Sequence, residues 1–191
     1  VEERVLHEFV AAVQCNVPHE STGSRRYPLF AHFSRQCHLS DLNRQIRQGS
    51  PYPIRALCSF GLNINGYPNN KSWTTALESL DFFVDTDLFL TPTAKYADIV
   101  LPACSSFERE MLHTTPEQRI YYTPPVIAPL GQSRADLDII CALARRLAPE
   151  DTLLCSGAAA LYDYWLSQMD LSLDILRHAD EPIQLAQEPY R

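Results

Sequence analysis

Four residues stand directly after two apolar stretches of this sequence, where they could bind a ligand. Gly61 and Asn63 follow the first stretch, and Asp87 and Thr91 follow the second. Glycine lets the backbone approach a flat or phosphorylated ligand closely because it has no Cβ, and Asn63 offers two donors and one acceptor. The Asp87 carboxylate could accept two parallel hydrogen bonds, the pairing that a guanine edge presents with its ring N–H and amino group. The Thr91 hydroxyl could add a further contact, beside the free N–H groups of the helical turn behind it.

The elements that would position these residues follow a strand–helix–strand order. Residues 54–60 and 82–84 are apolar runs that are too short for helices and rich in strand formers. Residues 71–80 between them have the apolar face of a helix, and residues 98–102 predict a third strand. Ligands of open α/β sheets bind beyond the carboxyl ends of the strands. Right-handed crossovers would therefore bring both pairs of polar residues to one edge of a parallel sheet.

Each polar residue in this region also has a purely structural interpretation. Asp87 and Thr91 could simply cap the turn after the strand, as aspartate and threonine commonly do. Asp98 begins a strand in an apolar setting, so we expect it to bond to nearby backbone N–H groups rather than to a ligand.

The run from Thr91 to Pro102 reads TPTAKYADIVLP and closely resembles the TxTAxxADxVLP signature of the molybdopterin oxidoreductases, the dimethyl-sulfoxide-reductase superfamily. Asp87 matches the aspartate that usually precedes this signature. Residues 53–63 are similar to the KAL strand and GxNP turn of the family, with Ile64 in place of the proline. The resemblance covers roughly residues 40–180 and includes a closing helix up to Leu147.

The fold class that both the element order and the resemblance imply is α/β. Residues 40–150 are expected to form a Rossmann-like, three-layer lobe with a mostly parallel sheet, which is the third domain in this family. Residues 151–191 are expected to add a helical extension at the C-terminus. Residues 1–39, an amphipathic helix and an irregular segment, match nothing in the family.

The resemblance also implies a role as one piece of a larger enzyme. In the family this lobe binds the guanine-nucleotide end of one of two molybdopterin guanine dinucleotides, which makes Gly61, Asn63, Asp87 and Thr91 the implied cofactor-binding residues. No catalytic residue and no molybdenum or iron–sulfur ligand is implied within this chain. The bis(molybdopterin guanine dinucleotide) molybdenum centre and an iron–sulfur cluster would belong to the parent enzyme, and we expect the fragment alone to be inactive. Its implied partners are the remaining domains of the parent and an iron–sulfur electron-transfer subunit.

Composition excludes some other classes of function. Residues 1–50 carry six Arg and five acidic residues, a net +1, and residues 51–191 carry ten Lys or Arg and eighteen acidic residues, a net −8. An acidic body of this kind argues against a nucleic-acid surface. We expect no membrane span, because no apolar run approaches the roughly 18 residues required. No secretion signal opens the chain, so a segment upstream in the parent would decide whether the compartment is cytoplasmic or periplasmic.

The six cysteines form no CxxC pair, which argues against a zinc ribbon or an iron–sulfur site. His32 and the Cys37–His38 pair have a spacing that fits no common metal site. Three of the cysteines lie in apolar elements and are expected to be buried: Cys58, Cys104 and Cys141.

Three alternative functions remain open on the sequence. The first is a free-standing nucleotide-binding or regulatory module without redox activity. The second is a hydrolase, although the chain has no GxSxG elbow and Ser156-Gly157 lacks its context. The third is a structural lobe that binds nothing at the polar edge.

Other segments have simpler local signals. Ser40 and Gly49 are predicted to bound a short helix, and residues 16–36 a loop. The remaining expectations are a helical turn opened by the Ser105–Glu108 capping box, a strand over 119–123, helices over 133–147, 158–169 and 172–179, and a loose tail from Pro182.

Overall fold

The computed structural model describes residues 22–34 and 38–185. These residues form two compact units, the first ending at Leu101 and the second beginning at Pro102. The lobe expected over 40–150 therefore contributes residues to both units. The helix predicted over residues 1–14 lies outside the described residues. No helix in the described part of the chain is long and apolar enough to cross a membrane.

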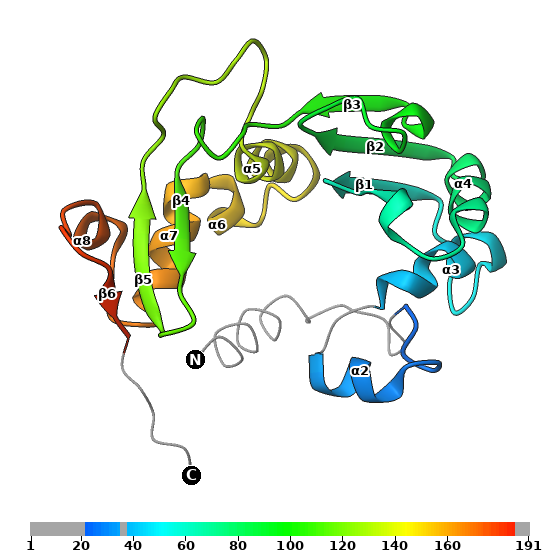
Figure 1. The fold of residues 1–191 in the computed structure, drawn as a ribbon, viewed down its shortest axis with the longest axis horizontal. Helices are drawn as coiled ribbons and strands as arrows, with labels where there is room; N and C mark the ends of the chain where they lie inside the picture. Colours follow the sequence, from blue (N-terminus) through cyan, green and yellow to red (C-terminus); the bar gives the residue numbers. More distant parts are fainter. Residues whose placement is uncertain (1–21, 35–37, 186–191) are drawn as a thin grey trace. The chain divides into compact units, whose positions relative to one another are not determined.

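The first unit consists of short helices and three strands (Figure 1). Its elements are α2 (Pro28–Ser34), η2 (Leu39–Asp41), α3 (Leu42–Gln48), β1 (Ala56–Phe60), η3 (Ile64–Gly66), α4 (Asn70–Glu78), β2 (Phe82–Asp87), η4 (Ala94–Tyr96) and β3 (Ile99–Pro102). The helix α2 corrects the loop predicted over 16–36. It begins at Pro28, where the fixed φ of proline suits the first helical position. Helix α3 ends at Gly49 as predicted, since this residue has a φ of 66°.

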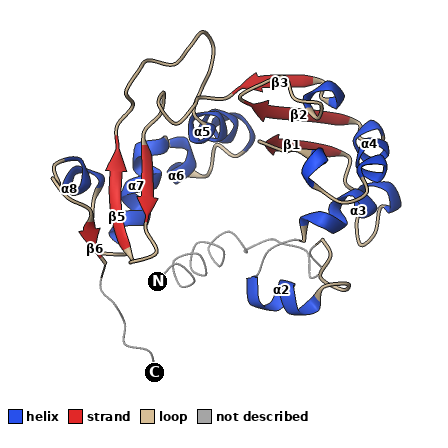
Figure 2. Ribbon diagram, in the orientation of Figure 1, coloured by secondary structure: helices blue, strands red, loops and turns tan. Residues whose placement is uncertain are grey.

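The three strands form one parallel sheet in the order β1-β2-β3 (Figure 2). In its β1–β2 ladder, Ala56 faces Phe82 and Phe60 faces Thr86. Parallel pairing follows from the crossover through α4, because two parallel strands cannot be joined by a tight turn. The predicted parallel α/β architecture is confirmed.

One face of this sheet carries the core of the first unit. Phe83 of β2 and Leu57 of β1 pack with Trp73 and Leu77 of α4, and Trp73 is 0% exposed. Helix α4 begins where the Asn69 side chain accepts a hydrogen bond from the Ser72 N–H, an N-cap that its sequence supports. The apolar face predicted for this helix is confirmed.

The opposite face of the sheet is more open than the sequence indicated. Cys58, Phe60 and Phe82 are exposed. Residues 54–60 alternate little between apolar and polar side chains, which predicts a strand buried on both faces; this expectation is wrong, and so is the predicted burial of Cys58. An uninterrupted apolar run predicts a strand that can be buried on two sides, but the number of faces covered depends on how many helices pack on the sheet.

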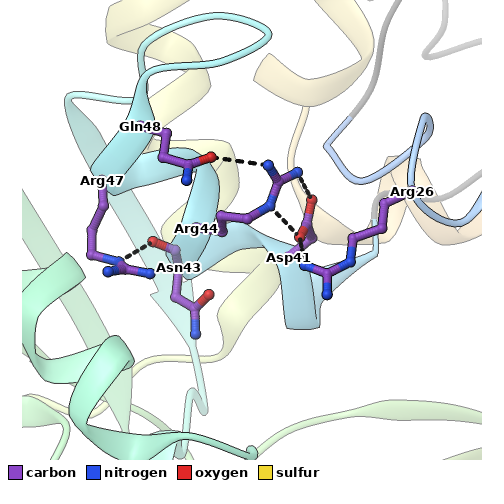
Figure 3. A network of polar contacts seen from close by, with 6 residues as sticks. All are labelled: Arg26, Asp41, Asn43, Arg44, Arg47 and Gln48. Atoms are coloured by element: carbon purple, nitrogen blue, oxygen red, sulfur yellow. Dashed lines mark hydrogen bonds and ion pairs between the residues drawn. The ribbon is translucent and has the colours of Figure 1, made fainter.

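A buried carboxylate ties helix α3 to the segment before it (Figure 3). Asp41 is 1% exposed and receives two hydrogen bonds from Arg44, at 2.8 Å to Oδ1 and 2.6 Å to Oδ2. Arg26 adds a longer contact of 3.4 Å. The hydrogen bonds from Arg44 lower the pKa of Asp41, since they stabilise its charged form. This pairing makes Asp41, not Ser40, the polar anchor at the start of α3.

The second unit combines an antiparallel sheet with four helices (Figure 1). Its elements are β4 (Met111–Thr114), β5 (Arg119–Thr123), α5 (Asp136–Leu147), α6 (Thr152–Cys155), α7 (Ala158–Ser167), α8 (Leu173–Arg177) and β6 (Ile183–Gln184). The sheet order is β4-β5-β6. The strand predicted over 119–123 and the helices predicted near 133–147, 158–169 and 172–179 are all present.

In the second unit two local predictions are wrong, and two short elements, β4 and α6, were not predicted. The strand β4 was not predicted, because its four residues are too few to show an alternation. The Ser105–Glu108 segment forms a turn rather than the start of a helix, although Glu108 Oε2 accepts the Ser105 N–H as in a capping box. The tail includes strand β6, which pairs with β5 and places Leu185 in the apolar core. That core also contains Ile120, Leu166, Leu173 and Leu176.

Candidate functional site

The carboxyl ends of β1 and β2 lie side by side in the first unit. The Gly61 N–H donates a hydrogen bond of 2.8 Å to the carbonyl of Thr86. Because Thr86 immediately precedes Asp87, the loop that carries Gly61 and Asn63 begins beside the end of β2. The structure thus brings these two parts of the predicted site to the same edge of the sheet.

Gly61 occupies a position that favours glycine. Its φ is 66°, in the left-handed region that residues with a side chain rarely adopt. A Cβ built on this residue would meet no atom within 4 Å, so the backbone here borders open space. A ligand could therefore approach the peptide groups on either side of Gly61 closely.

Asn63 shapes the loop that follows Gly61. Its Oδ1 accepts a hydrogen bond of 3.1 Å from the Asn65 N–H, which begins the short helix η3. The side chain is exposed, and no hydrogen bond of its Nδ2 amide to any described residue is found. The two donors of Asn63 thus remain available to a ligand while its acceptor stabilises the loop.

Thr93, which the sequence interpretation did not select, joins the two loops of the site. Its hydroxyl oxygen accepts a hydrogen bond of 3.1 Å from the Ile64 N–H, and both residues are buried. This bond connects the loop after β1 to the loop after β2. Thr93 is the second threonine of the TxTAxxADxVLP signature, and this was the one feature of the sequence that could have identified it. What its hydroxyl contacts is visible only in the fold.

Asp87 and Thr91 make the local bonds that the structural interpretation predicts. Asp87 Oδ1 accepts the Leu88 N–H at 2.7 Å, and the Thr91 hydroxyl oxygen accepts the Ala94 N–H at 3.3 Å. These contacts do not use up the carboxylate. Each of its oxygens can accept two hydrogen bonds, and Oδ2 has no partner among the residues that the structure describes. Capping and ligand binding are therefore compatible at Asp87.

An exposed apolar loop lies between Asp87 and Thr91. Its three residues are Leu88, Phe89 and Leu90, of which Phe89 is 77% and Leu90 82% exposed. Exposed apolar side chains in a row often mark a surface that another molecule or domain covers.

A second carboxylate, Asp85, is buried just behind the site. It is 0% exposed, and its Oδ1 accepts a hydrogen bond of 2.5 Å from the Ser59 hydroxyl. Its other oxygen, Oδ2, has no hydrogen-bond partner in the part of the chain that the structure describes. Burial is the main cause that raises the pKa of Asp85, and the nearby charge of Asp87 adds to the effect. The sequence indicated only that Asp85 stands near the end of a strand, and its burial was not predicted.

The raised pKa of Asp85 predicts a pH-dependent stability difference. The folded protein binds the proton of the Asp85 carboxyl more tightly than the unfolded chain does. The protonated carboxyl therefore favours folding at low pH, and this contribution is lost as the pH rises through the pKa of the folded state. We expect the free energy of unfolding of Asp85→Asn to rise with pH relative to that of the unsubstituted chain. The expected gain is on the order of 1 kcal/mol between pH 4 and pH 7. Urea unfolding of both proteins at several pH values measures this difference. A constant difference would show that Asp85 titrates normally.

Asp98 has the structural role that its setting predicts. Its Oδ2 accepts the Phe83 N–H at 2.7 Å, and its own N–H donates to the Phe83 carbonyl at 2.8 Å. The pair fixes the start of β3 against β2, so Asp98 is confirmed as a structural residue.

The remaining candidates are not among the residues that form the sheet edge. The His38 ring stacks on Tyr27 with centroids 3.9 Å apart, and Phe30 approaches it edge-on. Cys37, which was considered with His38, lies outside the described residues. The burial predicted for Cys104 and Cys141 is confirmed.

Comparisons with known proteins agree on one family. A family model described as molybdopterin oxidoreductase matches residues 32–146, so the expectation that residues 1–39 match nothing in the family is wrong for residues 32–39. A probable oxidoreductase of Bacillus subtilis is 44% identical over 89 residues, which are 47% of this chain and 8% of that protein. A putative formate dehydrogenase of Staphylococcus haemolyticus is 43% identical over 98 residues, 51% of this chain and 10% of that protein. The chain thus spans about a tenth of the length of these relatives.

A solved structure extends the similarity to the fold. The acetylene hydratase from Pelobacter acetylenicus matches with a TM-score of 0.64 and 26% sequence identity, over 73% of this chain and 20% of that chain. The family match includes the parallel sheet, the site loops and the signature from Thr91 to Pro102. This chain belongs to the molybdopterin oxidoreductase family, within the dimethyl-sulfoxide-reductase superfamily.

Proposed function

We propose that this chain is the nucleotide-binding lobe of a larger molybdenum-dependent oxidoreductase. In this proposal the edge formed by Gly61, Asn63, Asp87 and Thr91 binds the guanine-nucleotide end of a molybdopterin guanine dinucleotide. The observation that carries the proposal is the Asp87 carboxylate, which stands at the carboxyl end of a parallel strand with Oδ2 unpaired among the described residues.

The chemistry of this edge suits guanine better than the other common bases. Guanine presents a ring N–H and an exocyclic amino group side by side, and a carboxylate can accept both bonds. Adenine presents an acceptor at the corresponding ring nitrogen, which would face the carboxylate without a proton between them. The open space beside Gly61 and the free amide donors of Asn63 provide room and donors for the rest of the nucleotide.

The redox chemistry of such an enzyme is supplied by the molybdenum and its pterins. The residues of this chain would bind and orient the nucleotide end of the cofactor at a distance from the reaction. We therefore propose that the isolated chain does not turn over substrate, and that an iron–sulfur cluster and the molybdenum ligand belong to other parts of the parent. Oxo-transfer by the purified 191-residue chain would contradict this assignment.

Calorimetric titration with three nucleoside diphosphates tests the nucleotide site directly. The guanine nucleotide should bind more tightly than the hypoxanthine nucleotide by about tenfold, because the latter lacks the amino group and one charge-assisted hydrogen bond. The adenine nucleotide should bind most weakly. Equal affinities, or no binding of any of the three, would overturn the assignment of this edge.

The size and metal content of the native protein distinguish the proposal from its main alternative. About one molybdenum per polypeptide, on a chain several times longer than this one, is expected for a cofactor-binding lobe. A native polypeptide of this size without molybdenum that still binds the guanine nucleotide would instead identify a free-standing nucleotide-binding module.

A further inference from the structure

The second unit contains a cavity of about 550 Å³ that the nucleotide site does not use. It lies among the turn at Cys104–Glu110, the segment that leads into α5, and the start of α7. All the residues that line it belong to this unit. Its charged lining residues are Glu108, Arg109, Glu110, Arg134, Asp138 and Arg145.

Two of the three acidic residues in the lining are already bonded. Glu108 accepts the Ser105 N–H at 2.7 Å on one oxygen and the Leu130 N–H at 2.6 Å on the other. Glu110 accepts the Tyr122 hydroxyl at 2.9 Å and pairs with Arg177 at 3.0 Å. These bonds hold the walls of the cavity in place.

The arginines that line the cavity have fewer hydrogen-bond and ion-pair partners among the described residues than its two glutamates do. The Arg109 Nε is buried and has no hydrogen-bond partner among the described residues. No acidic partner of Arg109, Arg134 or Arg145 is found among residues 22–34 and 38–185. Arg145 donates to the carbonyl of Cys155, at 3.0 Å. A buried guanidinium donor without an acceptor is costly, so Arg109 Nε lacks a group that would accept its hydrogen bond. Arg134 and Arg145 are exposed and can donate to a ligand in the cavity.

The backbone around Arg134 is held on both sides. Its N–H donates to the Pro102 carbonyl at 3.1 Å, and its carbonyl accepts the Cys104 N–H at 2.9 Å. Ala103 and Arg134 form an isolated parallel bridge. The backbone of Arg134 is therefore a fixed point in the cavity wall, from which its exposed side chain extends.

We propose that this cavity binds an oxyanion, a phosphate or a carboxylate, through Arg109 and Arg134. Guanidinium groups bind both anions by paired N–H···O hydrogen bonds. The source is either a free small molecule or an acidic side chain of the rest of the parent protein, and both present the same oxygen acceptors. The cavity shares no lining residue with the nucleotide edge, whose residues all belong to the other unit.

Replacing Asp138 should change the affinity for an anion in the opposite direction from replacing an arginine. Asp138 lines the same cavity, and no hydrogen bond or ion pair of its carboxylate is found in the described part of the chain. Its negative charge opposes binding of an anion. The proposal therefore predicts that Asp138→Asn binds an oxyanion more tightly, whereas loss of either arginine weakens binding.

The experiment is a titration of the 191-residue chain with inorganic phosphate and, separately, with acetate, followed by amide chemical shifts. Arg109→Met and Arg134→Met should each weaken binding about tenfold or more, and Asp138→Asn should strengthen it several-fold. Arg146→Met is the matched control, because this exposed arginine follows Arg145 in α5 but does not line the cavity. Circular dichroism of each variant checks that it is folded.

The outcomes separate the proposal from general attraction of anions. Shifts confined to residues around the cavity, with loss in both arginine variants and no change in the control, would support it. The proposal would be overturned if neither anion bound the unsubstituted 191-residue chain. Equal effects of Arg146→Met and Arg134→Met would also overturn it. Binding to this chain but not to the full-length parent would identify a carboxylate of the parent as the natural occupant.

Discussion

Replacing Asp87 by alanine should strongly weaken guanine-nucleotide binding and leave the free energy of unfolding nearly unchanged. Within the described residues the side chain makes one local bond, to the Leu88 N–H, so little stability depends on it. Two charge-assisted hydrogen bonds to the base would be lost together, which corresponds to a decrease in affinity of about 100-fold or more. Calorimetric titration and urea unfolding of the same preparation measure the two effects.

Asp81 offers a matched control for this substitution. It precedes the same strand at the opposite end and pairs with Arg55 at the surface. Asp81→Ala removes the same charge from the protein, so it should leave nucleotide affinity unchanged if the effect at Asp87 is local. Equal losses in the two variants would indicate a general electrostatic effect instead of recognition of the base.

Asp87→Asn should change which base is preferred. An amide presents one acceptor and one donor, whereas the guanine edge presents two donors. Xanthine presents a ring N–H beside a carbonyl oxygen, which matches the amide. The variant should therefore bind xanthosine diphosphate more tightly than guanosine diphosphate. Retained preference for guanosine diphosphate would contradict direct pairing between residue 87 and the base.

Trp73→Ala should cause the largest loss of stability in the first unit. Trp73 is fully buried and packs with Leu77 and Phe83, and its ring lies 5.3 Å from that of Tyr67. Truncating a buried tryptophan leaves a large cavity and costs about 3–5 kcal/mol, a sizeable part of the stability of a typical domain. Urea unfolding monitored by circular dichroism measures the loss.

The same substitution should also weaken nucleotide binding, although Trp73 does not lie at the sheet edge. Its core cluster includes Leu62 and Ile64, the residues that flank Asn63 in the site loop. Thr75→Ala, an exposed change in the same helix, is the control and should alter stability by less than about 0.5 kcal/mol. A loss of stability in Trp73→Ala no greater than this control would show that the cluster does not support the first unit.

The sequence by itself determined the parallel strand–helix–strand core and the position of its polar edge. Local signals were sufficient there: an apolar run, a helix with one apolar face, and a second apolar run allow few arrangements other than a right-handed crossover. The capping contacts of Asp87 and Thr91 and the structural role of Asp98 were likewise predictable, because they involve backbone groups close in sequence or in the neighbouring strand.

Only the tertiary structure decided the features that depend on distant residues. The bond between Thr93 and Ile64 joins loops that are 29 residues apart, and the pairing of Asp85 with Ser59 spans 26 residues. Neither leaves a periodic pattern in the sequence. The exposure of Cys58 depended in the same way on which face of the sheet the helices cover.

The second unit shows the same division between local and long-range information. Its amphipathic helices were predicted from their own residues, whereas β4 and β6 are too short to be recognised without their partner strand. The cavity that contains Arg109 and Arg134 could not be predicted either, since burial and the lack of acidic partners are properties of packing. Short-range propensity thus determined the elements, and long-range packing determined which polar groups were left for a ligand.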